Sequence, residues 1–532
     1  MSSSGNPPAQ AGAWSPFGER AFALLWTATL ISNIGTWMHD VGAGWLMTTL
    51  DSSPAVVTLV QAATTLPVFC FALLAGALAD RFDRRRMLII INLLLLGVVT
   101  TLALLVWGEQ MTPGLLIAFT LAIGTGAAFM APAWQAIVPQ LVPPEQLRPA
   151  IALNSMGINV ARAIGPAVAG VLIASVGLAA PFALNALSFL VILGALSMWK
   201  PGPAPVLRPT GSILMDMATG LRHVRHNPAM LATAARAAAF FLFASAYWSL
   251  LPLIARGVEG GGSTLYGALM GVVGAGAVTG ALLLPRLNHL AATDAMAQIG
   301  TVGTGIALVL MALAGTATLL LPAAFLGGLS WIAVLTSFNV SAQTALPGWV
   351  RARGLAVYLM VFFGAMALGS LVWGQVAAQL SVRAALLLAT AGLALGLLAT
   401  RCLKLGQGEM LDLTPASAWP MAPLPAEGQA PDSPAMVMVE YRIAVENKPE
   451  FLARLNAVAH ERLRNGAMQW HVHESVEEPG LWIETFHLPS WNEHLAQHER
   501  VSNADLDSHA AVRRLHLENT APRVRHFIAA KQ

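Results

Sequence analysis

The side chains best suited to chemistry in this chain are a few ionisable and polar groups inside long apolar stretches. Asp40 lies well inside the first stretch, and Asn33, Trp37 and Asp40 share one helical face because their spacing is i, i+4 and i+7. Arg162 lies midway along the fifth stretch, with Asn159 one turn before it. An ionisable group costs free energy in an apolar environment, so each is a candidate functional residue.

If the carboxylate of Asp40 and the guanidinium of Arg162 lie in one cavity, two interpretations are open. In the first, Asp40 exchanges a proton, as a carboxylate in an apolar cavity can, while Arg162 faces the substrate. In the second, the two form a structural ion pair, or Asp40 lies at the outer rim. The weaker candidates for the same cavity are amides and one arginine that could also extend to the membrane edge: Gln135, Gln343, Asn339 and Arg236.

A charged loop, GALADRFDRRR from Gly76 to Arg86, joins the second and third apolar stretches. A loop this short between two membrane-length segments must lie at a bilayer surface. Its four arginines predict the cytoplasmic surface, because positively charged loops stay in the cytoplasm.

The composition predicts a membrane protein with a soluble appendage. Hydrophobic residues make up 56% of the chain and charged residues 11%, against about 25% charged in soluble domains. Residues 1–404 hold 19 Lys/Arg and 10 Asp/Glu, whereas residues 405–532 hold 11 and 17. The basic residues of the first part cluster at the ends of apolar stretches, so they predict topology rather than nucleic-acid binding.

The two cysteines, Cys70 and Cys402, argue against disulfides and against a cysteine metal site.

Twelve apolar stretches are long enough to cross a bilayer, which takes about 20 residues. They lie near 21–50, 54–79, 87–107, 112–138, 150–175, 179–199, 232–255, 264–285, 293–313, 317–345, 354–380 and 382–403. With a cytoplasmic amino terminus, the inner segments hold 15 Lys/Arg and the outer loops hold two. This bias predicts that both termini are cytoplasmic.

The two sets of six stretches resemble each other. The matching residues are Gln135, Pro139, Arg148, Gly165 and Gly170 in the first set and Gln343, Pro347, Arg353, Gly369 and Gly374 in the second. Two parallel six-helix repeats, together with the charged loop, resemble the major facilitator superfamily over residues 15–405. The sequence LWTATLISNIGTWMHDVGAGWLM and the Asp-Arg-Phe-Asp-Arg-Arg loop are similar to its enterobactin-exporter-like, transmembrane secretion effector branch.

The resemblance implies roles for the loop. Asp80 would cap the start of the eleventh span near Arg351 and Arg353, and would hold the halves together in the outward-facing state. The motif also includes Gly76, Arg81, Arg84 and Arg85, and the arginines at 84–86 would bind anionic lipid. Asp83 stands where the family usually has glycine, which puts the strength of this gate in doubt.

The fifth stretch resembles the signature of proton-coupled antiporters. Gly157, Gly165, Pro166 and Gly170 follow its pattern, although the final pair is Ala169-Gly170 rather than Gly-Gly. Small residues let helices approach closely and proline bends the helix. The resemblance to the antiporter signature implies export rather than uptake.

The appendage alternates strand and helix patterns after a proline-rich linker. Strands are expected at 436–445, 467–476, 481–488 and 523–530, and helices at 449–464 and 491–516. The order βαββαβ is the ferredoxin-like unit. It resembles the dimeric α+β barrel of antibiotic biosynthesis monooxygenases, which implies a possible homodimer. The pairs His471/His473 and His494/His498 have ligand-like spacing, but with no third strong ligand the sequence predicts no metal site.

We therefore predict an all-α membrane protein of twelve transmembrane helices with a C-terminal α+β ferredoxin-like domain. The predicted parts are a disordered N-terminus (1–18), two six-helix bundles (19–199 and 231–405), a cytoplasmic linker (200–230), a Pro-rich linker (406–435) and the soluble domain (436–532). The expected function is proton-driven export of a small organic molecule, siderophore- or drug-like, across a bacterial inner membrane, with no cofactor and no enzymatic activity. Two alternatives are a membrane-tethered monooxygenase-like enzyme and a transporter-derived sensor or scaffold.

Overall fold

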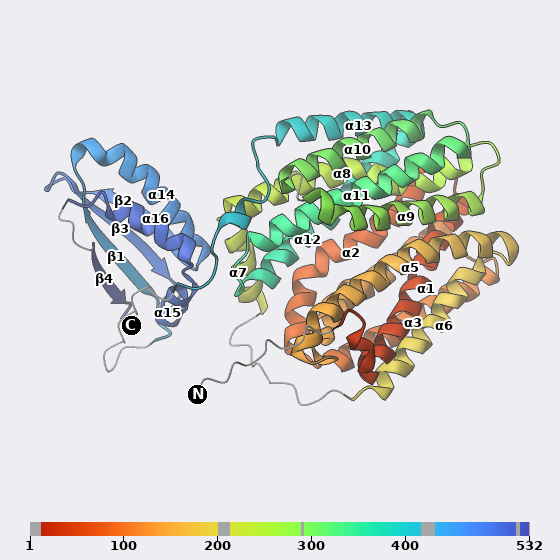
Figure 1. Cartoon of the computed structure of the whole chain (residues 1–532), viewed down its shortest axis with the longest axis horizontal. Coiled ribbons are helices and arrows are strands. Elements are labelled where there is room, and N and C mark those ends of the chain that lie inside the picture. The colour runs from red at the N-terminus through yellow and green to blue at the C-terminus, as the bar shows by residue number, and fades with distance from the viewer. Residues whose placement is uncertain (1–11, 201–212, 289–291, 417–430, 518–521, 531–532) are drawn as a thin grey trace, which may run out of the picture. The chain divides into compact units, whose positions relative to one another are not determined.

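Twelve long helices confirm the predicted spans. The computed structural model describes residues 12–200, 213–288, 292–416, 431–517 and 522–530. Within this part, twelve helices are long and apolar enough to cross a bilayer. They are Arg20–Leu50 (α1), Pro54–Arg81 (α2), Arg84–Trp107 (α3), Pro113–Ile137 (α4), Leu147–Ser175 (α5), Ala179–Met198 (α6), Pro228–Gly257 (α8), Ser263–Asn288 (α9), Thr293–Leu313 (α10), Ala317–Thr344 (α11), Arg351–Gln379 (α12) and Val382–Ala399 (α13), as Figure 1 shows.

The helix ends follow ordinary capping chemistry. Proline is the first residue of α2, α4 and α8, a position where its missing N–H costs no hydrogen bond. Asp83 caps α3, because its Oδ1 accepts a hydrogen bond of 2.7 Å from the backbone N–H of Arg86. Asp83, which departs from the family pattern, therefore has a local structural role.

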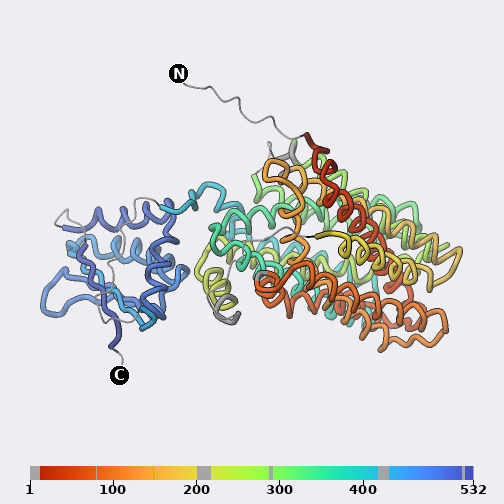
Figure 2. Tube along the Cα trace, turned by 90° about the horizontal axis from the view of Figure 1, so that it is seen from below, coloured from red at the N-terminus to blue at the C-terminus, as the bar shows by residue number. Residues whose placement is uncertain are grey.

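Contacts divide the chain into two compact units. The first comprises Met1–Ile213, Ala235–Phe338 and Tyr358–Leu403, and the second comprises Leu214–Ala234, Asn339–Val357 and Lys404–Gln532. In the first unit, α1 packs against α5 and α6, α2 packs against α4, and α3 packs against α4 and α6. Helix α5 also packs along α9, as the ribbon and the tube both show (Figures 1 and 2).

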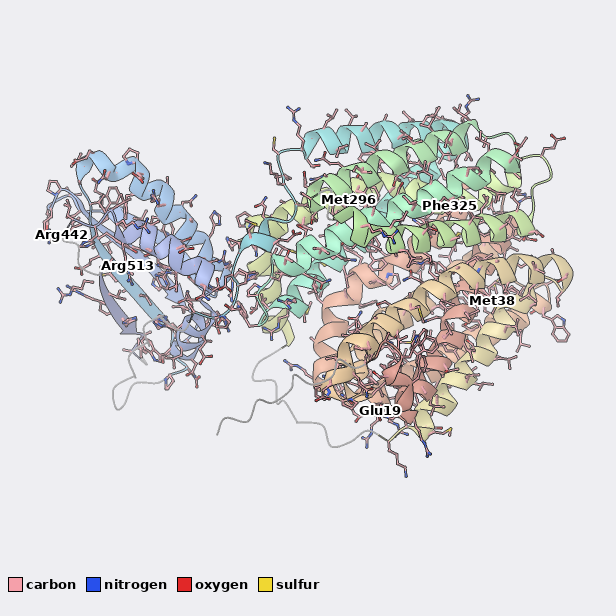
Figure 3. All side chains as sticks on the ribbon, in the orientation of Figure 1. Glu19, Met38, Met296, Phe325, Arg442 and Arg513 are labelled. Atoms are coloured by element: carbon pink, nitrogen blue, oxygen red, sulfur yellow. The ribbon has the colours of Figure 1, made fainter. Side chains whose placement is uncertain are left out.

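Apolar side chains fill the interior of the first unit and also cover its outside. Met38 on α1 and Met296 on α10 are buried, whereas Phe325 on α11 is exposed (Figure 3). Large apolar side chains are exposed along α3, including Leu94 and Leu104. Such a surface suits contact with lipid chains rather than with water.

Parts of the predicted linkers lie outside the described residues, namely 201–212 and 417–430, as do residues 1–11 of the predicted disordered N-terminus. Ser15–Gly18 forms a short 3-10 helix. Ile213–Arg225 forms a helix, α7, within the predicted 200–230 linker. Its apolar residues recur at helical spacing (Leu214, Met217, Leu221 and Val224), a pattern hidden by the surrounding basic residues and prolines.

The C-terminal domain has a four-stranded antiparallel sheet. Its elements are Ala435–Arg442 (β1), Lys448–Arg464 (α14), Met468–Glu474 (β2), Leu481–Leu488 (β3), Trp491–Arg500 (α15), Asn503–Arg513 (α16) and Arg523–Ile528 (β4). The strand order is β2-β3-β1-β4. The predicted helix over 491–516 is two helices, because a capping box at Ser502 and Asp505 starts α16. The resemblance to monooxygenases, and the dimer it implies, stay predictions.

Buried and more exposed side chains alternate along β1 and β3, so one face of this sheet is buried. Side chains at every second position, among them Val437, Val439 and Phe486, join Phe451 and Val458 of α14 in one core. A polar cluster is buried within it: Glu484 accepts hydrogen bonds from the Tyr441 hydroxyl (2.8 Å) and from the Trp470 indole N–H (2.9 Å). Buried polar atoms need such partners, so this cluster fixes the arrangement of the strands.

We expect the domain to lose stability in acid through the buried pair of Glu461 (α14) and His509 (α16), whose side chains meet at 2.5 Å. Burial by itself raises the pKa of Glu461, but the charge and hydrogen bond of His509, with Arg462 and Arg464, lower it overall. A carboxyl with a lowered folded-state pKa stabilises the fold above its unfolded pKa of about 4.3, and this contribution is lost as the pH falls through the folded value.

Amide hydrogen exchange of the full chain, corrected for intrinsic exchange rates, measures this loss of stability. The protection of the backbone amides in α14 and α16 should fall below about pH 4.3. Glu461→Gln should lower the protection at pH 7 and flatten the acid dependence. Glu450→Gln, at an exposed ion pair with Arg454 on the same helix, is the control and should change neither. Equal behaviour of the two variants would contradict the prediction.

Candidate functional site

Close packing of α1 against α5 brings Trp37 and Arg162 together. A Cβ at Gly165 would lie 2.6 Å from Cβ of Trp37 and 2.9 Å from the carbonyl oxygen of Ile34, so only glycine allows this approach. Nearly one turn earlier on α5, the Arg162 guanidinium carbon lies 5.2 Å from the Trp37 ring centroid. This is a cation–π contact inside an apolar bundle.

Arg162 keeps unused hydrogen-bonding capacity. Its Nε is buried and has no hydrogen-bond partner among the described residues. Asp40 and Arg162 form no ion pair with each other in the described part of the chain, so the structure does not show the structural pair of the second interpretation. A buried guanidinium with an unpartnered N–H can bind an anionic group that enters the site.

Asp40 lies on α1 near the contact of that helix with α9. It precedes the last residue of α1, Leu50, by ten residues, which is about 15 Å along the helix axis. One turn beyond Asp40, the position of a Cβ at Gly44 would lie 2.9 Å from the Tyr266 hydroxyl of α9. The Tyr266 ring also stacks on Trp45 and is close enough to interact with the Asp40 charge.

The neighbour of Asp40 points elsewhere, as the helical spacing predicts. His39 is 2% exposed, and its ring packs edge-on against Phe182 of α6 at a centroid distance of 4.9 Å. Asn159 donates a hydrogen bond of 2.9 Å to the carbonyl oxygen of Ser155 on its own helix. Asn33 is partly buried on α1.

The remaining cavity candidates lie on α4, α8 and α11. Gln135 is exposed near the end of α4, and Asn339 and Gln343 lie near the end of α11, in the second unit. Arg236 is 3% exposed and forms an ion pair with Asp294 of α10. Asp294 is an acid that the sequence analysis missed, because it lies in the first turn of its span, where a charge does not stand out.

The three motif glycines of α5 all lie at helix contacts. Gly157 lies against the Trp26 ring of α1, at 3.3 Å from the position of a Cβ, and Gly165 lies against Trp37. Gly170 faces α9, where the position of a Cβ would be 2.9 Å from Cα of Gly267. Helix α5 therefore packs closely on both α1 and α9, and a Cβ at Gly165 or Gly170 would come closer than 3.0 Å to a neighbouring helix.

Two arginines of the charged loop bind helix ends. Arg84 donates to the carbonyl oxygen of Ala136 at the end of α4 (3.1 Å), and Arg85 donates to those of Leu196 and Ser197 at the end of α6 (2.8 and 2.9 Å). The last carbonyls of a helix lack partners within the helix and carry its negative dipole end, so arginine binds them well.

Of the other predicted gate residues, Gly76 is in open space, since a Cβ there would meet no atom within 4 Å, and Arg81 has an interaction partner. The side chain of Asp80 lies outside what the structure describes. In the second unit, Arg351 donates to the carbonyl oxygen of Leu346 (3.3 Å) and Arg353 lies against Gly220 of α7.

The chain is similar to known transporters. It is 25% identical to the staphyloferrin A transporter of Staphylococcus aureus over 65% of this chain and 87% of the relative. It is 26% identical to the enterobactin exporter EntS of Shigella boydii over 55% of this chain and 70% of the relative. It is 28% identical to the multidrug efflux pump Tap of Mycobacterium tuberculosis over 38% of this chain and half of the pump.

Solved structures show the same fold. One is a POT family transporter in complex with 5-aminolevulinic acid, with a TM-score of 0.62 at 13% identity, over 74% of this chain and 98% of that one. Another is a bacterial homologue of the human lysosomal transporter Spinster, with a TM-score of 0.58 at 15% identity, over 76% of this chain and all of that one. At these identities the likeness shows the fold alone.

A family profile decides the classification. The profile described as transmembrane secretion effector matches residues 11–532, which includes the C-terminal domain. The twelve apolar helices, the transporter relatives and the shared fold agree with this match, and none of these relatives is an enzyme by name. The chain therefore belongs to the transmembrane secretion effector family of major facilitator transporters and is a multi-pass membrane protein of bacterial type.

Proposed function

We propose that this protein is a secondary active exporter that moves a small, siderophore- or drug-like molecule by alternating access, in exchange for protons. The names of its relatives, which include siderophore transporters and a multidrug efflux pump, support the class of cargo. The observation that carries the proposal is the contact of Arg162 with Trp37 where α5 packs against α1, together with Asp40 three residues after Trp37 on the same helix.

The separation of the two charges supports distinct roles. Asp40 takes up and releases the driving proton, with the Tyr266 hydroxyl as its polar neighbour on α9. Arg162 rests on the face of Trp37 and offers the N–H at Nε, which has no partner among the described residues, to an anionic part of the cargo. Since no ion pair ties Asp40 to Arg162, each can change partners during the cycle without breaking a pair between them.

Metabolite profiling of cells that lack the protein tests this function. A small molecule bearing an anionic group should accumulate inside these cells. Everted membrane vesicles containing the protein should then take up that molecule when a pH gradient is imposed, and should stop when the gradient is collapsed. A cargo that accumulates outside the deletion cells would show uptake and would contradict export.

We further propose that the protein lies in the inner membrane with both termini in the cytoplasm, because of the 15-to-2 bias of basic residues. Asp83→Cys, made after the exposed Cys70 and Cys402 have been changed to serine, reports on the loop. A membrane-impermeant maleimide should label position 83 in everted vesicles and leave it unlabelled in intact cells. The reverse pattern would overturn this orientation.

A further inference from the structure

We propose that His494, His498 and His526 of the C-terminal domain form a binding site for a divalent transition-metal ion of the zinc type. His494 and His498 lie one turn apart on α15, and His526 lies on β4. One ring nitrogen from each side chain lies within 4.8 Å of the others. The ring centroids of His498 and His526 lie 4.6 and 5.0 Å from that of His494.

The third ligand arises from strand pairing, which is why the sequence analysis did not find it. His526 pairs with Val437 across the β1–β4 ladder, and residues opposite each other in an antiparallel pair point to the same face. Val437 points into the core, so His526 also points to the face on which the core lies. Its ring there contacts Trp491 of α15, at a centroid distance of 5.6 Å.

A small movement would complete the coordination. Three nitrogens bound to zinc at 2.0–2.1 Å in tetrahedral geometry are about 3.4 Å apart. The present spacing of up to 4.8 Å therefore has to shorten by about 1.4 Å at most, and His498 and His526 are partly exposed. Three imidazoles leave a fourth position open for water or another ligand.

The buried member of the group has a polar atom without a partner. His494 is 2% exposed, and its Nε2 has no hydrogen-bond partner among the described residues. Its Nδ1 lies 3.4 Å from Oε1 of Gln497, and the Gln497 amide nitrogen donates to the carbonyl oxygen of Arg462. With the proton on Nδ1, the lone pair of Nε2 is available to a metal, which is the usual support for a histidine ligand.

A neutral imidazole is the form of histidine that binds a metal. The positive charge of the neighbouring Arg462 is balanced by Glu484, at 3.6 Å. A set of nitrogen ligands without thiolates suits zinc, nickel or copper rather than magnesium or calcium.

Metal titration of the full-length protein tests the site. The protein is purified through a tag without histidines, stripped with a chelator and titrated with Zn²⁺ in a calorimeter, with bound zinc counted by elemental analysis. One zinc ion per chain should bind. His498→Gln and His526→Gln should each weaken the affinity at least tenfold, and Gln497→Met, which changes a positioning residue, should weaken it by about tenfold.

The chain supplies a matched control. His471 and His473 stack at a centroid distance of 6.0 Å on exposed β2, so His471→Gln/His473→Gln removes two histidines from the same domain without touching the site. This variant should bind zinc as the unchanged protein does. The proposal is overturned if no zinc binds, if the control loses the zinc, or if the site variants keep full affinity while melting at the normal temperature.

Discussion

Asp40→Asn should reduce pH-gradient-driven transport in everted vesicles to the level of vesicles without the protein. Asparagine keeps the shape of the side chain and its hydrogen-bonding oxygen but cannot exchange a proton in the accessible pH range. If Asp40 carries the driving proton, the carrier then cannot couple cargo movement to the gradient. Cargo binding should survive, because Arg162 and Trp37 are unchanged and form no ion pair with Asp40.

A matched substitution lies on the same polypeptide segment. Asp51→Asn changes an acid just beyond the end of α1, where Oδ1 accepts a hydrogen bond from the backbone N–H of Ser53, and asparagine can accept the same bond. Transport by this control should be unchanged. Full-rate, gradient-driven transport by Asp40→Asn would remove Asp40 from the mechanism, whereas loss of cargo binding as well would point to a structural role.

Gly170→Val should destabilise the protein and abolish transport. A Cβ at this position would lie 2.9 Å from Cα of Gly267 and 2.9 Å from the carbonyl oxygen of Ser263, and backbone atoms cannot rotate away. Forcing side-chain atoms into such a contact costs about 1–3 kcal/mol or separates the helices. The melting temperature should therefore fall. Size-exclusion chromatography of heated samples in detergent measures it.

The control for this change is another glycine in a membrane helix. Gly97→Val on α3 introduces the same side chain where a Cβ would meet no atom within 4 Å. Both variants replace glycine by valine within a helix, so the change in intrinsic helix propensity is the same. The difference between their melting temperatures therefore measures the effect of the contact of α5 with α9. Equal melting temperatures for the two would show that this contact contributes nothing to stability.

The sequence predicted the helices and strands well because their causes are local. Long apolar runs define the spans, and alternation of apolar and polar residues defines β1 and β3. The misses were elements whose pattern is weak or interrupted. α7 is short and surrounded by basic residues, and the capping box at Ser502 divides a stretch that had appeared as one helix.

The candidate site was predicted less completely, because its contacts join residues far apart in the chain. Spacing placed Asn33, Trp37 and Asp40 on one face but said nothing of the distance to Arg162. Tyr266, the neighbour of Asp40, was missed, although a tyrosine in a span of α9 that is otherwise mainly apolar is a signal that could have been used.

Partners of other residues also depend on tertiary contacts. Arg236, a predicted cavity residue, pairs with Asp294, and the role of Arg84 and Arg85 at helix ends depends on where α4 and α6 finish. No local pattern in the sequence records such pairings.

The hydrogen bonds of Arg84 and Arg85 also bear on how such a carrier changes shape. They link the start of α3 to the C-terminal ends of α4 and α6. Three helices of the amino-terminal half are therefore hydrogen-bonded to one another at one end. Under the proposed alternating-access mechanism, we expect these three helices to move as one rigid group. The rearrangement would then occur at the contact of α5 with α9, where Gly170 and Gly267 lie against each other.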